Sequence, residues 1–333
     1  MAEIRLPPTV SALIMTLEQA GYETWAVGGC VRDSLLGCTP HDWDLTTSAL
    51  PEQMLALFPQ AIPTGLAHGT VTIPTADGPL EITTFREETG YADHRRPDAV
   101  RFVTQIGSDL ARRDFTVNAM AWHPQRGLCD PFDGQGDLRR RLIRCVGEPE
   151  RRFSEDALRM LRALRFAARL HFDIDGATAA AMRRHAPELC CVSSERIYAE
   201  LCGLLCADGA ALGEMYPELL RVAVPLLRLP TSRHAMRTWL QQLGAVGAQT
   251  LLNWCAEYGE LPVEQAQALL SALLQETRQQ PLAIGGKALE AVGIAPGPGM
   301  GRLLQRLRDA IDEGAVENEP SALLSLVRQW TKP

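Results

Sequence analysis

The stretch that decides the fold is Gly28-Gly29-Cys30-Val31-Arg32-Asp33, followed at residues 42–47 by Asp-Trp-Asp-Leu-Thr-Thr. The apolar run at 25–27 predicts a buried strand, and the residues after the two glycines predict a short helix over 30–36. Residues i and i+2 of a strand point to the same face. We therefore expect Asp42 and Asp44 to project together from a second strand over 42–46, with Trp43 turned into the core.

Two carboxylates this close repel each other, and a bound cation removes that cost. Carboxylate oxygens favour Mg²⁺, and reactions that displace a phosphate leaving group often use two such ions about 4 Å apart. Glycines at 28 and 29 let the backbone approach a triphosphate, and the helix N-terminus after them suits an anion. The alternative is an ordinary strand-turn-strand with solvated aspartates. The pairing of the two motifs favours the metal and triphosphate site.

Composition describes an ordinary globular protein with one unusually basic segment. The 333 residues are 46% hydrophobic and 22% charged, with a net charge of −7, which argues against a generally basic nucleic-acid surface. Residues 138–169 nevertheless hold ten arginines against four acids, which suits a protein that grips phosphate at one place. Nine scattered cysteines predict reduced thiols and a cytoplasmic location, and no stretch is long enough to span a membrane.

The first part of the chain predicts a small sheet with helices. A helix is expected over 51–58 with Ser48 as its N-cap, and two antiparallel strands over 68–73 and 80–85. Glu81 lies on the second of these strands, either facing solvent on an edge or joining Asp42 and Asp44 as a third carboxylate. Residues 86–101 show no period and predict a loop, whose Tyr91, Asp93, Arg95 and Arg96 suit a base and phosphates or plain solvent.

Two basic segments follow. Residues 109–119 predict a mixed helical face on which Arg113 can bind phosphate oxygens as a bidentate fork. From residue 139 strand signals vanish, and a long helix is expected to about 170 with Ser154 as its N-cap. Within it Asp156, Arg159, Arg162 and Arg165 are spaced by threes. Asp156 and Arg159 form either a solvated salt bridge or a carboxylate acceptor and a guanidinium donor that read the edge of a base.

Taken together, these segments resemble the class II, bacterial-type CCA-adding tRNA nucleotidyltransferases, within the poly(A) polymerase and CCA-adding family of the polymerase-β superfamily. The matching blocks are GGCVRDSLLG with DWDLTT, TGLAHGTVTI, EITTFR, RRPDAVRF, DLARRDFTVNAMA, DPFDGQGDL, RCVGEPERRFSEDALRMLRALRF and SSERIYAEL. They follow the family's order over residues 25–201. A weaker match, GGKALEAVGIAPGPGMGRLL, covers 285–304.

The resemblance implies an α+β fold: a small mixed-sheet nucleotidyltransferase head over 1–138, a helical neck over 139–206, and a helical body and tail over 207–333 that bind tRNA. It implies addition of CCA to the tRNA 3′ end from CTP and ATP, with Mg²⁺ as cofactor. The implied catalytic residues are Asp42 and Asp44 as metal ligands and Glu81 as a neighbour. The implied nucleotide-binding residues are Gly28, Gly29, Arg32 and Arg113 for the triphosphate, Asp156 and Arg159 for the base, and Arg162 and Arg165 beside them.

A single acceptor and donor pair explains why C and A would be chosen. Cytosine N4 and N3, like adenine N6 and N1, present an amino donor beside a ring acceptor, whereas uracil and guanine present the reverse pattern. The alternatives are a poly(A) polymerase, an enzyme that adds only A or only CC, an aminoglycoside-type nucleotidyltransferase, and an inactive tRNA-binding module. Residues 65–73 lack the basic segment of the polymerases, the segment over 156–159 exceeds what an aminoglycoside enzyme needs, and retention of Asp42 and Asp44 opposes an inactive module. The oligomeric state is left open.

Overall fold

The computed structural model describes residues 4–90, 99–259, 262–279, 282–312 and 315–330. The chain forms two compact units, Met1–Val192 and Ser193–Pro333. The first unit holds the sheet and every residue of the predicted site, and the second is helical. An α+β architecture with a mixed sheet followed by helices is therefore confirmed.

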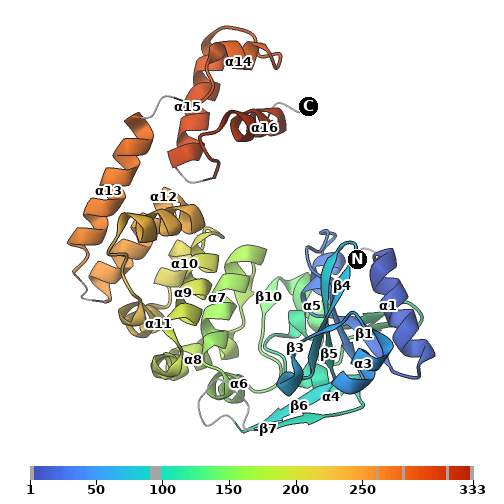
Figure 1. Cartoon of the computed structure of the whole chain (residues 1–333). Coiled ribbons are helices and arrows are strands. Elements are labelled where there is room, and N and C mark those ends of the chain that lie inside the picture. The colour runs from blue at the N-terminus through green and yellow to red at the C-terminus, as the bar shows by residue number, and fades with distance from the viewer. Residues whose placement is uncertain (1–3, 91–98, 260–261, 280–281, 313–314, 331–333) are drawn as a thin grey trace. The chain divides into compact units, whose positions relative to one another are not determined.

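A seven-stranded mixed sheet forms the centre of the first unit (Figure 1). Its strands, in spatial order, are β3 (Ile62–Gly65), β4 (Thr70–Thr75), β5 (Gly78–Thr84), β2 (Asp44–Thr47), β1 (Thr24–Val27), β8 (Ala121–His123) and β9 (Gly127–Cys129). Strand β2 pairs parallel with β5 and antiparallel with β1. Because β5 lies inside the sheet, the alternative that placed Glu81 on an edge strand is wrong, although its side chain is exposed.

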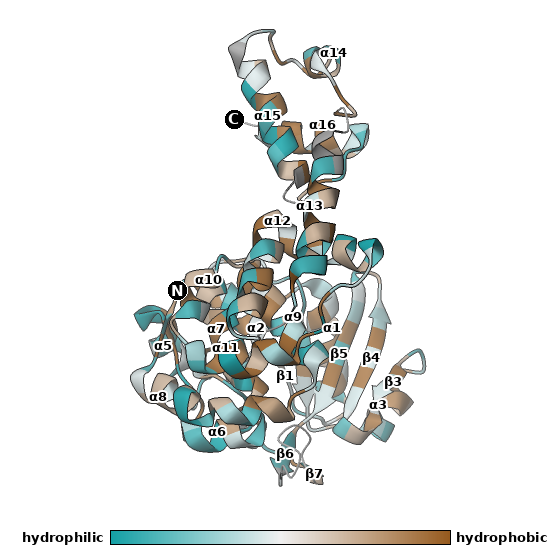
Figure 2. Ribbon diagram, turned by 90° about the vertical axis from the view of Figure 1, so that its left-hand side faces the viewer, coloured by the Kyte–Doolittle hydropathy of each residue, from teal (hydrophilic) through white to brown (hydrophobic). Residues whose placement is uncertain are grey.

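The strands form where the sequence alternates or is fully apolar. All four residues of β1 are buried, and β4 and β5 pair antiparallel around the turn at 76–77. In Figure 2 hydrophobic colour gathers on β4 and β5, whereas α6 (Pro149–Glu155) is largely hydrophilic. A buried cluster of Trp25, Val27, Phe85, Leu110 and Ala121 packs the sheet against α4 (Ile106–Ala111). This packing fixes the ends of β1 and β2, where the two motifs lie.

Two details of the second strand differ from the prediction. Strand β2 begins at Asp44, so Asp42 lies in the segment before it. Trp43 is only half-buried instead of belonging to the core. The physical reason is the turn at 37–43, which ends too late for residues 42 and 43 to enter the ladder with β1, whose pairing with β2 reaches only Leu45.

The first unit also contains helices, some of which pack on this sheet. They are α1 (Pro8–Gln19), α2 (Gly29–Leu35), α3 (Pro51–Leu57), α4, α5 (Gly134–Arg140), α6, α7 (Leu158–Leu170) and α8 (Gly176–His185), with short 3₁₀ turns η1 (Leu66–His68), η2 (Thr116–Asn118) and η3 (Ala186–Cys191). Helix α1 packs on β1, and α3 on β3 and β4. Leu50, not Ser48, precedes α3, and the Ser48 hydroxyl accepts from the backbone N–H of Glu23.

Three predicted segments were wrong in their local structure. Residues 109–119 are not one helix, because α4 ends at Ala111 and η2 follows. The loop predicted over 86–101 contains a hairpin of β6 (Arg86–Thr89) and β7 (Ala99–Phe102). Tyr91, Asp93, Arg95 and Arg96 lie outside the described residues. Beyond residue 139, β10 (Leu142–Ile143) and β11 (Asp173–Ile174) form a short parallel pair.

The long helix predicted to 170 is two helices. Helix α6 ends at Glu155, Asp156 is extended with φ −146° and ψ 102°, and α7 begins at Leu158. Ser154 is inside α6, where its hydroxyl donates to the Arg151 carbonyl, so it is not an N-cap. The break is stabilised locally, because the Asp156 Oδ1 accepts from the Leu158 N–H at 3.1 Å. Such a carboxylate cap satisfies a backbone donor that begins the new helix.

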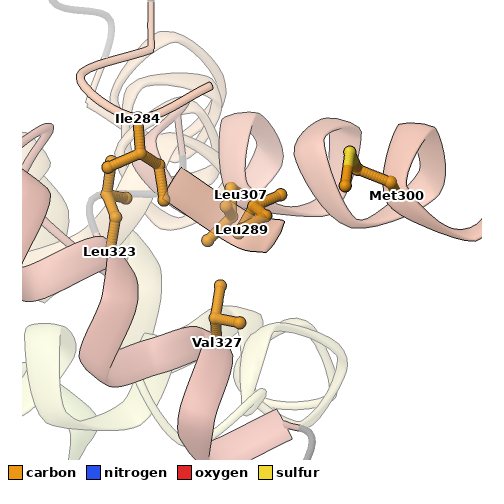
Figure 3. Close-up of a cluster of buried hydrophobic side chains, with 6 residues drawn as sticks. All are labelled: Ile284, Leu289, Met300, Leu307, Leu323 and Val327. Atoms are coloured by element: carbon orange, nitrogen blue, oxygen red, sulfur yellow. The ribbon is translucent and has the colours of Figure 1, made fainter. Parts of the chain in front are cut away.

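The second unit is built from helices alone in its described ranges. They are α9 (Ser194–Leu205), α10 (Ala210–Glu214), α11 (Pro217–Ala223), η4 (Val224–Leu226), α12 (Arg233–Glu257), α13 (Glu264–Gln279), α14 (Gly286–Glu290), α15 (Pro298–Asp312) and α16 (Pro320–Trp330). Gly244, at φ 68°, breaks α12. Near the C-terminus, α14, α15 and α16 share the apolar cluster drawn in Figure 3, which includes Leu289, Leu307 and Leu323.

None of the helices in the described ranges combines the length and apolar character needed to cross a membrane. All nine cysteines lie in described ranges, and each is a free thiol.

Candidate active site

The glycine pair shapes one wall of a cavity of about 520 Å³ in the first unit. Gly28 follows the end of β1 with φ 81°, a backbone conformation that glycine adopts without strain. A Cβ at this position would lie 3.0 Å from Arg113 Nη1. Gly28 therefore allows the backbone and the Arg113 guanidinium to meet at the same wall.

Two arginines are fixed beside the glycines. Arg32 is 3% exposed and donates from Nη1 to Asn118 Oδ1 at 2.6 Å and from Nε to Asp33 Oδ1 at 2.8 Å. Arg113 Nη2 donates to Asp109 Oδ2 at 3.1 Å. Burial would raise the pKa of Asp109, but the charges of Arg112 and Arg113 lower it, so this buried carboxylate stays ionised. The i,i+4 spacing of Asp109 and Arg113 was visible in the sequence, whereas nothing local indicated Asn118.

The two predicted metal-binding carboxylates line the same cavity. Asp42 and Asp44 both line it, and Asp44 pairs in register with Glu81 on the neighbouring strand. A second hollow of about 450 Å³ is lined by Asp42, Asp44 and Glu81 together with Trp43. Burial raises the pKa of Asp44, the Arg113 charge opposes this rise, and Glu81 and Asp42 add to it. This gathering of like charges is what a cation would relieve.

Helix α7 supplies the third wall. Arg162, Arg165, Phe166 and Arg169 line the cavity, one or two helical turns apart. Arg162 donates from Nε and Nη2 to Asp114 Oδ2 at 2.9 and 2.7 Å. Burial would raise the pKa of Asp114, but Arg162, through its charge and hydrogen bonds, and Arg159 lower it to about 2. The cavity therefore combines five arginines (32, 113, 162, 165 and 169) with carboxylates at one end.

Comparison with known proteins identifies the family of this chain. The model of the poly(A) polymerase head domain matches residues 24–144, and a model for domain 2 of tRNA nucleotidyltransferases matches 234–327. A CCA-adding enzyme of Levilactobacillus brevis is 36% identical, over 95% of this chain and 96% of the relative, and one of Limosilactobacillus reuteri is 35% identical, over 96% of each. The chain belongs to the CCA-adding enzyme family.

A solved structure agrees with this assignment. The crystal structure of a Bacillus stearothermophilus CCA-adding enzyme in complex with CTP superposes with a TM-score of 0.59 at 31% identity, covering 98% of this chain and 99% of that one. Membership in the CCA-adding enzyme family makes this chain a nucleotidyltransferase, a class that uses a divalent metal. The resemblance stated from the motifs is thus confirmed.

Asp42 and Asp44 offer carboxylate oxygens to a divalent metal at the cavity wall. In the described ranges, no three His, Cys, Asp or Glu side chains are placed together as a metal cage. Two carboxylates at a cavity wall still fit a divalent cation that takes substrate phosphates and water as its other ligands. Asp42 and Asp44 meet that requirement, whereas Glu81 is their neighbour across the β2–β5 pair.

The two residues predicted to read the base lie apart from the arginines that line the cavity. Asp156 and Arg159 are not among the residues that line the 520 Å³ cavity. Arg159 is 8% exposed and donates from Nη1 to Glu155 Oε2 at 3.0 Å and from Nη2 to the Arg112 carbonyl at 3.1 Å. Glu155, which the sequence analysis did not single out, also accepts from Arg152 at 2.6 Å.

Proposed function

We propose that this chain adds C, C and A to the 3′ end of tRNA, using CTP and ATP, without a nucleic-acid template. The observation that carries the proposal is the cavity in which two carboxylates of the β2 segment face the arginines of α2 and α7. The likeness to CCA-adding enzymes over nearly the whole chain supports it. A cytoplasmic location fits the nine free thiols.

The arginines bind and orient the triphosphate. Arg113 at the glycine wall and Arg165 on α7 are the best placed, since guanidinium groups hold phosphate oxygens as forks. Arg32, Arg113 and Arg162 are each paired with a carboxylate, at 2.7, 3.1 and 2.7 Å, so they contribute charge from fixed positions. Preorganised charge of this kind stabilises the transition state without a reorganisation cost.

The carboxylates act at the other end of the cavity. Asp42 and Asp44 would hold Mg²⁺, which when bound lowers the pKa of the primer hydroxyl and offsets the charge of the departing pyrophosphate. The 3′-hydroxyl of the primer attacks the α-phosphate in line, and pyrophosphate leaves on the side of the arginines. Glu81, in register with Asp44, is proposed to keep the surroundings of Asp42 and Asp44 negative and so to favour a cation there.

Base selection is assigned to Asp156 and Arg159. Glu155 and two backbone carbonyls accept from Nη1 and Nη2 of Arg159, which fixes the plane of its guanidinium. A fixed plane supports the idea that its remaining donors present one hydrogen-bonding edge to a base. We propose that Asp156 accepts from the amino group of C or A while Arg159 donates to the ring nitrogen.

The test is incubation with tRNA that lacks its 3′ end, offering each nucleoside triphosphate alone and then CTP with ATP. Addition that stops after CCA supports the proposal, whereas a long A tract would identify a poly(A) polymerase. Addition of A alone to tRNA ending in CC, or of CC alone, would identify a partial enzyme. Binding without addition would identify an inactive tRNA-binding module.

The metal assignment is tested with Asp44→Asn. We expect nucleotide addition to fall by about a thousandfold or more, because the variant keeps the shape of the side chain and removes one charged metal ligand. Binding of tRNA, measured by gel shift, should be unchanged. The matched control is Glu52→Gln, an exposed carboxylate in α3, which should add nucleotides at the wild-type rate. Unchanged addition by Asp44→Asn would contradict the assignment.

A further inference from the structure

One aromatic ring lies at the centre of the cavity's positive charge. Phe166, in α7, is 6% exposed and lines the cavity. The guanidinium carbons of Arg165, Arg162 and Arg32 lie 4.4, 5.2 and 5.3 Å from its ring centroid. Two of these arginines come from α7 and one from α2. A single side chain therefore contacts cations from both walls of the cavity.

The ring is itself held in place. Phe115, which is fully buried, packs edge-on against it, with ring centroids 6.0 Å apart and planes at 79°. Edge-to-face pairs of this kind are a preferred aromatic geometry. Because Phe166 is buried and braced, its position sets the position of the guanidinium groups that contact it.

Three guanidinium groups around one centre repel one another. Asp33 and Asp114 offset part of this repulsion through ion pairs with Arg32 and Arg162, each at 2.7 Å. The negative face of an aromatic ring attracts cations within about 6 Å, so Phe166 offsets a further part. Unlike an ion pair, a cation–π contact attracts a guanidinium group without using any of its N–H donors.

We propose that Phe166 is a positioning residue for the polyphosphate: its ring holds Arg32, Arg162 and Arg165 in the array that binds the triphosphate. The inference deepens the proposed function and rests on it for the identity of the ligand. Its chemical basis is the ring quadrupole, not only the apolar volume of the side chain. A ring that merely filled space would be replaceable by any apolar side chain of similar size.

Phosphate binding is measured by titrating purified protein with inorganic tripolyphosphate, CTP and CMP. We expect Phe166→Leu to weaken binding of tripolyphosphate and CTP about tenfold, to weaken CMP less, and to raise KM for CTP more than it lowers kcat. Phe166→Tyr keeps the aromatic face and should stay within about twofold of wild type. Phe172→Leu, a buried phenylalanine outside the cavity lining, is the matched control and should bind as wild type does.

Pentafluorophenylalanine at position 166 keeps the shape of the ring and removes its negative face, so it tests the idea even where Phe166→Leu does not fold. We expect it to weaken tripolyphosphate binding as Phe166→Leu does. Wild-type binding by the fluorinated protein, or an equal loss in Phe166→Tyr, would overturn the proposal. The tripolyphosphate titration needs no catalysis. A wild-type protein that binds tripolyphosphate but adds no nucleotide to tRNA would therefore refute the proposed function alone.

Discussion

Arg159 and Arg162 are one helical turn apart on α7, yet their surroundings differ sharply. The Arg159 side chain is 10% exposed, and its Nη1 and Nη2 donate to the buried Glu155 and to backbone carbonyls. The Arg162 side chain is 33% exposed, pairs with Asp114 and borders the cavity. The same residue type at a spacing of three is thus held against the α6 carboxylate at one position and lines the open charged cavity at the next.

The break between α6 and α7 determines which neighbours each of these two arginines contacts. Since α6 ends at Glu155 and α7 begins at Leu158, Arg159 is in the first turn of α7 and reaches back to α6. Arg162 lies one turn further on and points to Asp114 instead. A continuous helix capped by Ser154 and running to about 170, as the sequence suggested, would have placed Asp156 and Arg159 on one regular surface.

The largest effect on stability is expected from removing the carboxylate that pairs with the buried Arg159. Glu155→Gln removes the charge that compensates Arg159 and Arg152, both within 3.0 Å of Glu155. Removing one partner of a buried ion pair leaves a buried charge uncompensated and costs about 3 kcal/mol. We expect a clear loss of stability in urea unfolding and a lower melting temperature.

The control for this variant lies just before the same helix. Glu148 precedes α6, is exposed, and forms no side-chain cap. Glu148→Gln should therefore change the free energy of unfolding by about 0.5 kcal/mol or less. Equal effects of the two variants would show that Glu155 is not a buried partner of Arg159.

The second prediction concerns the ion pair between Arg162 and Asp114, whose contribution to stability depends on pH. The folded-state pKa of Asp114 is about 2 against an ordinary value of 3.8, so ionised Asp114 stabilises the fold above about pH 4. That stabilisation, about 2 kcal/mol, is lost as the pH falls from about 4 through 2. The stability gap between wild type and Asp114→Asn, measured by thermal unfolding, should narrow over this range. A gap independent of pH would contradict the role of the Asp114 carboxylate.

Much of this site was predictable from the sequence, for a physical reason. Gly28, Gly29, Asp42 and Asp44 belong to short segments in which local geometry dictates the residue type, and they do meet at one cavity. Arg113 was also placed correctly beside them. A positive φ favours glycine at its own position, and a pair of carboxylates two residues apart can be recognised from the sequence alone.

The parts that could not be predicted depend on contacts between distant segments. Asn118 binds Arg32 across 86 residues and Asp114 binds Arg162 across 48, and neither pairing leaves a local pattern. The edge position of Glu81 was wrong because strand order is set by the fold, which places β5 beside β2. Nothing in the sequence singled out Phe166, because the arginine that α2 brings to it lies far away in the chain.

The smallest expected effect concerns selection of the base, and it shows whether the start of α7 contacts the nucleotide. If Asp156 accepts from the amino group of C or A, then Asp156→Ala removes that acceptor and leaves Arg159 held by Glu155. One lost hydrogen bond of this kind is worth roughly tenfold in discrimination. We expect the rates for CTP and ATP, relative to UTP and GTP, to fall about tenfold, while tRNA affinity is kept. Asp173→Ala, at an exposed position of β11, is the control. Unchanged relative rates for all four nucleotides would mean that Asp156 only caps α7, and that the buried end of the helix supports the site without reading the base.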